Sequence, residues 1–200
     1  MMKISPEKRG RRAIARFIAA RSGVAAIEFA FILPVLVLLL FGSIEASEML
    51  TVKRRVVNAG NALVDLISQE PTITKAEVDD AIAGVRRLLE PTDTSTLSVN
   101  VVSVIKGDQA GDPVTVHWSL DEKGDEAYGP GATYSKLGDN KSVRPEASLV
   151  VVEMDFNYVS SLGGRIFSKQ MRFVSQTKRW PRKSARVELC ANADRTGCTG

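Results

Sequence analysis

The chain has 200 residues, of which 25% are charged and 44% hydrophobic, and this composition excludes a disordered, collagen-like or disulfide-dense protein. Two cysteines and one histidine exclude a four-thiolate zinc site and leave little for histidine-based catalysis. Residues 1–23 hold seven of the 27 basic residues and one of the 23 acidic residues. The remaining 20 basic and 22 acidic residues give residues 24–200 a formal charge of −2, so we expect no nucleic-acid partner.

The first predicted element is a transmembrane helix over residues 24–44, in which Glu28 is the sole charge. Its 21 residues span about 31 Å at ~1.5 Å each, which matches the hydrocarbon core of a bilayer. A buried core helix is the alternative, but apolar residues on every face of 29–41 exceed what a 200-residue protein can surround. The positive-inside rule then predicts a single pass, with 1–23 as a basic cytoplasmic leader.

A removable signal peptide fits this N-terminal region poorly. The basic segment is long, the apolar run exceeds a usual signal-peptide core, and Ile44-Glu45-Ala46 is a poor cleavage site before Ser47. An uncleaved anchor, or cleavage before the span, fits better.

A specific motif marks the junction between leader and span: Gly23 is followed five positions later by Glu28 and then by Phe29. A glutamate inside a membrane helix costs several kcal/mol unless it is paired, so it indicates function, although Glu28 also lies close enough to the headgroups to reach them. The arrangement resembles the processing site of type IV pilin-like proteins, in which a prepilin peptidase cuts after a glycine. The resemblance implies a processing site of Gly23, Val24, Glu28 and Phe29, with cleavage between the first two.

A longer stretch, about residues 21–65, resembles TadE-like proteins, the minor pseudopilins of the Flp/Tad tight-adherence pilus. It also contains Leu33-Pro34 within the span, followed by Gly42 and Glu45. The resemblance implies a non-enzymatic protein that helps to assemble or anchor a type IV pilus. Its implied partners are prepilin peptidase, other Flp/Tad pilins and the inner-membrane assembly platform. The alternative is an uncleaved, single-span periplasmic protein that binds a partner or the envelope.

The same resemblance implies an inner-membrane location, with the N-terminus cytoplasmic and the C-terminal domain periplasmic. The residues themselves show no nucleophile elbow, phosphate loop or zinc signature, so we expect no catalytic, cofactor-binding or metal-binding residues.

Two amphipathic helices are predicted after the span. The first extends the transmembrane helix over residues 45–70 and ends before Pro71. Its apolar residues recur every three or four positions: Met49, Val52, Val56, Ala59, Leu63 and Ile67. The second begins at Thr74, where Glu77 completes a capping box, and stops before Pro91.

From residue 97 the apolar period changes to two, which predicts about four strands. They centre on residues 97–105, 114–120, 150–158 and 171–173. Helices followed by strands predict a pilin-like α+β fold with an antiparallel sheet, in which residues 71–200 form the extracytoplasmic domain.

Three features of this domain are predicted to have no specific function. The long loop over residues 121–146 is interpreted as a mobile insertion, with a partner-binding surface as the alternative. Its acidic residues lack EF-hand spacing, so calcium binding is disfavoured; they are Asp121, Glu122, Asp125 and Glu126. His117 falls on the polar side of its strand and is predicted to be exposed.

Near the C-terminus, Cys190 and Cys198 enclose seven residues. In an oxidising compartment they are predicted to form a disulfide worth about 2.5 kcal/mol, with two free thiols in a frayed tail as the alternative. A basic patch around Trp180 is interpreted as a solvated strand end, with an anionic partner as the alternative; it contains Lys178, Arg179, Arg182 and Lys183.

Overall fold

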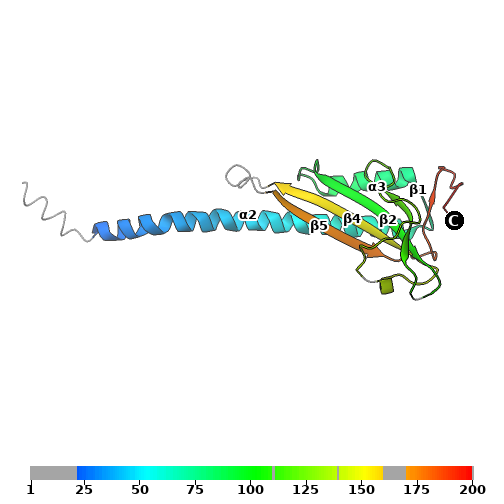
Figure 1. Cartoon of the computed structure of the whole chain (residues 1–200). Helices are drawn as coiled ribbons and strands as arrows, with labels where there is room; N and C mark the ends of the chain where they lie inside the picture. Colours follow the sequence, from blue (N-terminus) through cyan, green and yellow to red (C-terminus); the bar gives the residue numbers. More distant parts are fainter. Residues whose placement is uncertain (1–21, 110, 139, 160–169, 200) are drawn as a thin grey trace, which may run out of the picture. The chain divides into compact units, whose positions relative to one another are not determined.

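A computed structural model describes residues 22–109, 111–138, 140–159 and 170–199 (Figure 1). The chain divides into two compact units, one ending at Ala46 and one beginning at Ser47. All but the last two residues of the predicted leader lie outside the described residues. The domain boundaries predicted after residues 23, 44 and 70 remain predictions.

The long N-terminal helix is α2, Ser22–Gln69, which continues through Pro34. Its end just before Pro71 follows from the ring of proline, which disfavours helical geometry in the residue ahead of it. From Val52 onward, one face of α2 is buried at helical spacing. Gly60 lets this face lie close to the sheet, because a Cβ there would be 2.9 Å from Sδ of Met154.

The second helix is α3, Lys75–Leu88, and it begins with the predicted capping box. The Thr74 hydroxyl accepts a hydrogen bond from the Glu77 N–H at 3.3 Å, and the Glu77 carboxylate accepts one from the Thr74 N–H at 2.8 Å. That bond from the Thr74 backbone holds the pKa of Glu77 below its ordinary value. The buried face of the helix is Val78, Ala81, Ile82 and Val85.

Four strands form an antiparallel sheet in the order β3-β2-β4-β5. They are β2, Leu97–Lys106; β3, Val114–Leu120; β4, Ser148–Val159; and β5, Gln170–Arg179. Val101 and Val152 are partners across the two central strands. The predicted α+β fold, with its long helix, second helix and four-stranded antiparallel sheet, is therefore confirmed.

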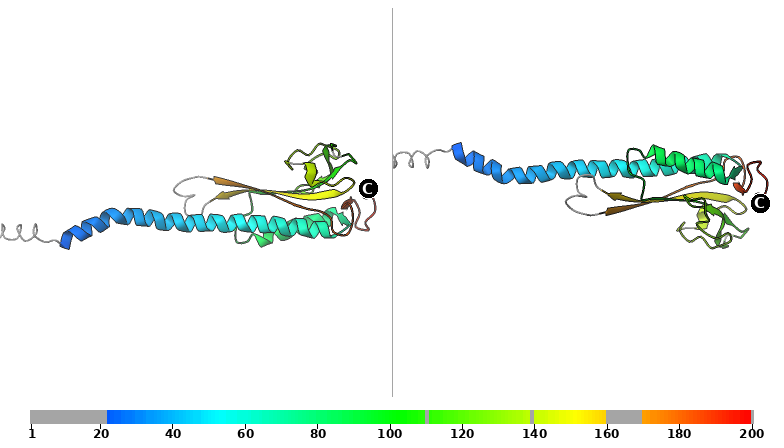
Figure 2. Two further views of the ribbon diagram at one scale, coloured as in Figure 1. Left: turned by 90° about the horizontal axis from the view of Figure 1, so that it is seen from below. Right: turned by 90° about the horizontal axis from the view of Figure 1, so that it is seen from above.

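Figure 2 shows this sheet between the two helices on one side and the loop after β3 on the other. The first face packs on α2 and α3, with Trp118, Phe156 and Met154 among its fully buried side chains. The second face is also buried, around Val102, Val104 and Val151. Both faces of the central strands are therefore core, which is why β4 begins with an unbroken apolar run.

The loop between β3 and β4 covers that second face, so its interpretation as a mobile insertion is wrong. Tyr134, Leu137 and Val143 from the loop are buried against the sheet. The backbone N–H of Tyr134 donates to the Val114 carbonyl at 2.8 Å, which extends the edge of β3. The loop also contains the 3-10 helix η1, Asn140–Ser142. The loop is held in place by apolar contacts with the strand side chains that point away from the helices.

A second sheet was not predicted. It pairs β1, Thr72–Thr74, in parallel with β6, Glu188–Cys190. Strands of three residues are too short for an alternating apolar pattern to be visible, and the two segments lie more than a hundred positions apart in the sequence.

Candidate functional site

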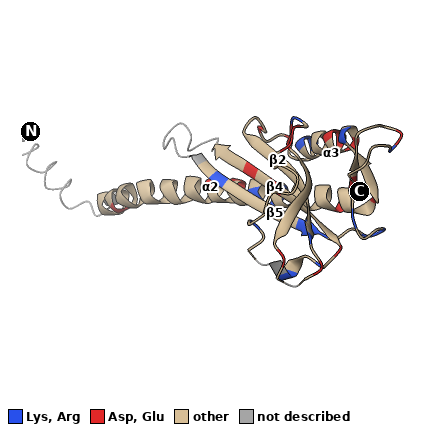
Figure 3. Ribbon diagram, turned by 45° about the vertical axis from the view of Figure 1, so that its right-hand side comes forward, with Lys and Arg blue, Asp and Glu red and all other residues tan. Residues whose placement is uncertain are grey.

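The apolar half of α2 exposes its large hydrophobic side chains on every face. From Val24 to Ile44 their exposed fraction runs from 39% at Val37 to 78% at Phe31. In Figure 3 this half is drawn almost wholly in the colour of uncharged residues. The helix is long and apolar enough to cross a membrane. An apolar surface of this size requires a non-aqueous partner, and a bilayer matches its length.

The four residues of the predicted processing site lie together in the first turns of α2, and all are exposed. Val24 and Glu28 are four positions apart, so they share one face of the helix. Among the residues that the structure describes, none forms a hydrogen bond or ion pair with Glu28. This carboxylate is therefore available to an external group.

Gly23 is not required by packing within the part of the chain that the structure describes. A Cβ at this position would have nothing within 4 Å, and the same holds for Gly42 further along the helix. Glycine inside a helix costs about 1 kcal/mol relative to alanine. The fold therefore offers no reason for glycine at residue 23.

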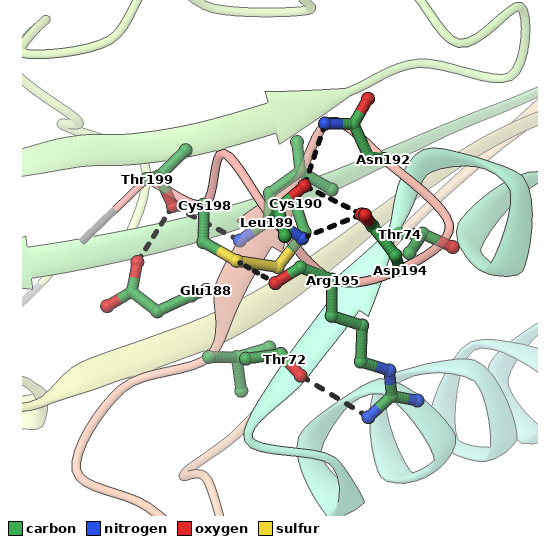
Figure 4. The surroundings of a disulfide bond; sticks show 12 residues. Thr72, Thr74, Glu188, Leu189, Cys190, Asn192, Asp194, Arg195, Cys198 and Thr199 are labelled. Atoms are coloured by element: carbon green, nitrogen blue, oxygen red, sulfur yellow. Dashed lines mark hydrogen bonds between the residues drawn. A yellow bond between two sulfur atoms is a disulfide. The ribbon is translucent and has the colours of Figure 1, made fainter.

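The predicted cysteines are joined by a disulfide in the second compact unit (Figure 4). Cys190 is fully buried at the end of β6. The segment between the cysteines is anchored by Arg195, which donates to Thr72 at 3.3 Å and to Glu77 at 3.2 Å. The C-terminal tail is thereby attached to the start of α3.

His117 is not exposed, contrary to the prediction. Its side chain is 9% exposed, and its Nε2 lies 2.6 Å from Oε2 of Glu188. Burial opposes ionisation of Glu188, but hydrogen bonds from His117 and Thr199 outweigh it and hold the pKa of Glu188 below its ordinary value. The prediction failed because the contacts that cover His117 come from distant residues, Glu188 of β6 and Thr199 of the C-terminal tail.

The basic patch around Trp180 is largely paired within the chain. Arg182 forms a salt bridge with Asp65 near the end of α2, and Nε of Arg179 lies 3.6 Å from the same carboxylate. Lys183 is 3.2 Å from Glu70. These exposed ion pairs contribute little stability each, but they tie the end of β5 to α2.

Two acidic residues after β3 accept hydrogen bonds from backbone N–H groups. Asp121 accepts hydrogen bonds from the N–H groups of Lys123 at 2.8 Å and Asp125 at 2.9 Å. Glu122 accepts from the Val99 N–H at 3.0 Å. The described part of the chain contains no group of three side chains placed to hold a metal ion.

A half-buried polar cluster on the second face of the sheet was not predicted. Glu153 of β4 accepts hydrogen bonds from the hydroxyls of Tyr128 at 2.7 Å and Tyr134 at 2.5 Å, and from Nζ of Lys136 at 3.0 Å. Burial raises the pKa of Glu153, but these donors outweigh it and the pKa is lowered overall. Burial and the Glu153 carboxylate raise the pKa of Tyr134. The cluster fastens the loop to the sheet.

We expect this cluster to make the domain sensitive to acid. The folded-state pKa of Glu153 lies below its ordinary value of 4.5, so its contribution to stability is complete above that pH and is lost as the pH falls through the folded-state pKa. Replacing Glu153 with glutamine should lower the free energy of unfolding by about 1–3 kcal/mol at neutral pH. Below about pH 4 the difference from wild type should shrink.

Thermal unfolding of the full chain in mild detergent, followed by near-ultraviolet circular dichroism across this pH range, measures the effect. The exposed Glu126, which lies outside the cluster, provides the control Glu126→Gln. An equal loss of stability in both variants, or a loss from Glu153→Gln that does not depend on pH, would contradict the expectation.

Comparison with known proteins identifies the N-terminal part of the chain. Residues 23–62 match the TadE-like protein family. The match begins at Gly23 and covers 40 of the 200 residues. No curated protein and no solved structure matches the chain significantly.

This TadE-like segment, residues 23–62, contains all four residues of the predicted processing site and the whole apolar half of α2. It also reaches into the buried half, as far as Ala62. The family resemblance recognised from the sequence is therefore confirmed for this segment. The sheet, the polar cluster and the disulfide lie outside the match.

Proposed function

We propose that this chain is a minor pseudopilin that takes part in assembling or anchoring an Flp/Tad type IV pilus, and that it is not an enzyme. The observation that carries the proposal is the TadE-like segment, whose glycine, glutamate and phenylalanine begin an exposed apolar helix. In this role the helix crosses the inner membrane once. The leader is cytoplasmic and the domain is periplasmic, where its disulfide is stable.

Maturation is the first step of the proposed mechanism. Prepilin peptidase would hydrolyse the peptide bond between Gly23 and Val24, which leaves a new α-amine on Val24. Support comes from Gly23 itself, since a Cβ there would have nothing within 4 Å among the described residues, so packing gives no reason for glycine. A small residue at this position serves an external enzyme that must approach the backbone closely.

Glu28 would then act in docking. After cleavage, the new amine at Val24 lies one helical turn from the Glu28 carboxylate, on the same face. A charged carboxylate in a membrane is costly unless it is paired. Pairing with the amine of its own chain or of a neighbouring pilin would remove that cost, and it would favour one axial register between helices. Prepilin peptidase, other Flp/Tad pilins and the assembly platform are the proposed partners.

The N-terminal sequence of the protein recovered from native membranes tests this function. A start at Val24 is expected. A start at Met1 or Met2 in cells that contain the peptidase would contradict the proposal, and it would favour an uncleaved, single-span periplasmic protein that binds a partner or the envelope.

A further inference from the structure

A groove of about 580 Å³ lies between α2 and α3 in the second compact unit. Its walls are mainly apolar and come from the C-terminal part of α2 and from most of α3. Leu66 on one wall is 52% exposed, and Leu88 on the other is 61% exposed. These leucines do not contribute fully to the core, so their apolar area is available to a partner.

Three small residues also line the groove: Ala62, Ala81 and Gly84. A Cβ at residue 84 would have nothing within 4 Å, so packing within the chain does not require glycine there. Glycine is among the least favourable residues in a helix interior, and α3 would be more stable without it. The open space therefore has no explanation within the described chain, and it suits an inserted side chain.

All charged residues that line the groove are acidic: Glu70, Glu77 and Asp80. Two of them already hold cations at the rim, since Nζ of Lys183 is 3.2 Å from Glu70 and a guanidinium nitrogen of Arg195 is 3.2 Å from Glu77. These carboxylates nevertheless remain exposed, at 43% for Glu70 and 46% for Glu77.

Asp80 is exposed as well, and among the described residues none pairs with it. The rim therefore favours a partner that carries positive charge.

We propose that this groove binds an amphipathic α-helix of another protein, whose apolar stripe is bordered by lysine and arginine. The stretch from Glu77 to Leu88 is about 17 Å long at ~1.5 Å per residue, which accommodates three turns of such a helix. Apolar residues at positions i, i+4 and i+7 of the partner would contact Leu66 and Leu88 and fill the space above Gly84. Its basic residues would face the acidic rim.

The inference does not depend on cleavage after Gly23, because all groove-lining residues lie in the second compact unit, well after the processing site. A Gly84→Leu chain should still be processed normally. An experiment that contradicts helix binding by the groove can therefore be distinguished from one that contradicts cleavage after Gly23.

The binding test uses the full chain in phosphatidylcholine nanodiscs and a fluorescent synthetic helix of about 15 residues, with leucine at i, i+4 and i+7 and lysine on both borders. Fluorescence anisotropy measures the Kd, and empty nanodiscs give the background. A second peptide carries glutamate in place of lysine. We expect the lysine peptide to bind at least about tenfold more tightly than the glutamate peptide, and its affinity to fall as salt rises.

Three groups of variants separate the contributions. Gly84→Leu places its Cβ in open space and directs a larger apolar side chain into the groove, so it should weaken binding at least about tenfold while the Tm stays the same or rises. The double change Leu66→Ala and Leu88→Ala should weaken binding by a similar factor. Asp80→Lys should weaken binding and flatten its salt dependence. Val174, 69% exposed on β5, provides the control Val174→Ala, which should change the Kd less than about twofold.

Equal binding of the two peptides, or an unchanged Kd in Gly84→Leu, would overturn the proposal. Self-association of the full chain that disappears in Gly84→Leu, with no competition by the lysine peptide, would also overturn it. That outcome would identify a second copy of the chain as the occupant.

Discussion

A chain in which Gly23 is replaced by leucine is expected to accumulate as an uncleaved precursor. The proposed cleavage requires the peptidase to approach the backbone beside residue 23, and a branched side chain would obstruct that approach. The rate of cleavage should fall at least about tenfold, which corresponds to about 1.4 kcal/mol of lost transition-state stabilisation, and the cleaved fraction should fall with it. N-terminal sequencing and gel migration of the protein from native membranes measure this fraction.

The matched control is Gly42→Leu. Gly42 lies in the same helix and, like Gly23, would have nothing within 4 Å of an added Cβ. Both substitutions place a Cβ in open space among the described residues, and both replace glycine with a residue of higher helical propensity. Normal processing of Gly42→Leu beside blocked processing of Gly23→Leu would assign the effect to the cleavage site. Normal processing of both would contradict the peptidase model.

The Glu28→Gln chain adds a separate comparison, because it removes the charge while keeping the size of the side chain. If it is cleaved at Val24 but its chains fail to join other pilins, docking is the role of the carboxylate. If both steps are normal, Glu28 only reaches the headgroups.

Replacing Trp118 with alanine is expected to destabilise the domain by about 3–5 kcal/mol, a large share of the stability of a typical domain. Trp118 is 2% exposed and packs in the core between the sheet and the helices. Its Nε1 donates a hydrogen bond to the buried Val187 carbonyl at 2.7 Å, just before β6. The substitution therefore creates a cavity and also detaches the C-terminal segment.

Trp118→Phe separates these two effects. It keeps most of the apolar volume but leaves the Val187 carbonyl unpaired, so we expect a loss of about 1–3 kcal/mol. The other tryptophan provides the control: Trp180 is 46% exposed, and Trp180→Phe should change the stability by less than about 1 kcal/mol. Thermal and urea unfolding of the full chain in detergent measure all three. A loss in Trp118→Ala no larger than that in Trp180→Phe would show that the domain core does not depend on Trp118.

The disulfide was predicted from the sequence, but the contacts of the segment that it closes were not. The expected oxidising compartment predicted pairing of Cys190 and Cys198, but nothing in their spacing indicated what the bridged segment contacts. In the structure Arg195 attaches this segment to Thr72 and Glu77, and β6 pairs with β1. Such contacts join positions more than a hundred residues apart, and they follow from how the chain folds back on itself.

The predictions for His117 and for the loop after β3 were wrong, because both depend on contacts with distant parts of the chain. The alternating pattern of its own strand predicted an exposed His117, and the length of the loop favoured a mobile insertion. The contiguous apolar run at the start of β4, from Leu149 to Val152, was the signal that both faces of the sheet are buried. Which segment covers the second face could not be read from that run.

Local sequence patterns were sufficient to predict the long helix with its apolar half, the capping box of α3 and the four strands. Each of these depends on residues that are neighbours along the chain, through helical or alternating spacing, charge or a local hydrogen bond. Three features could be identified only in the folded chain: the polar cluster around Glu153, the pairing of β1 with β6 and the acid-rimmed groove between α2 and α3. These features depend on which distant segments meet, because burial, ion pairing and open space are properties of the packed chain.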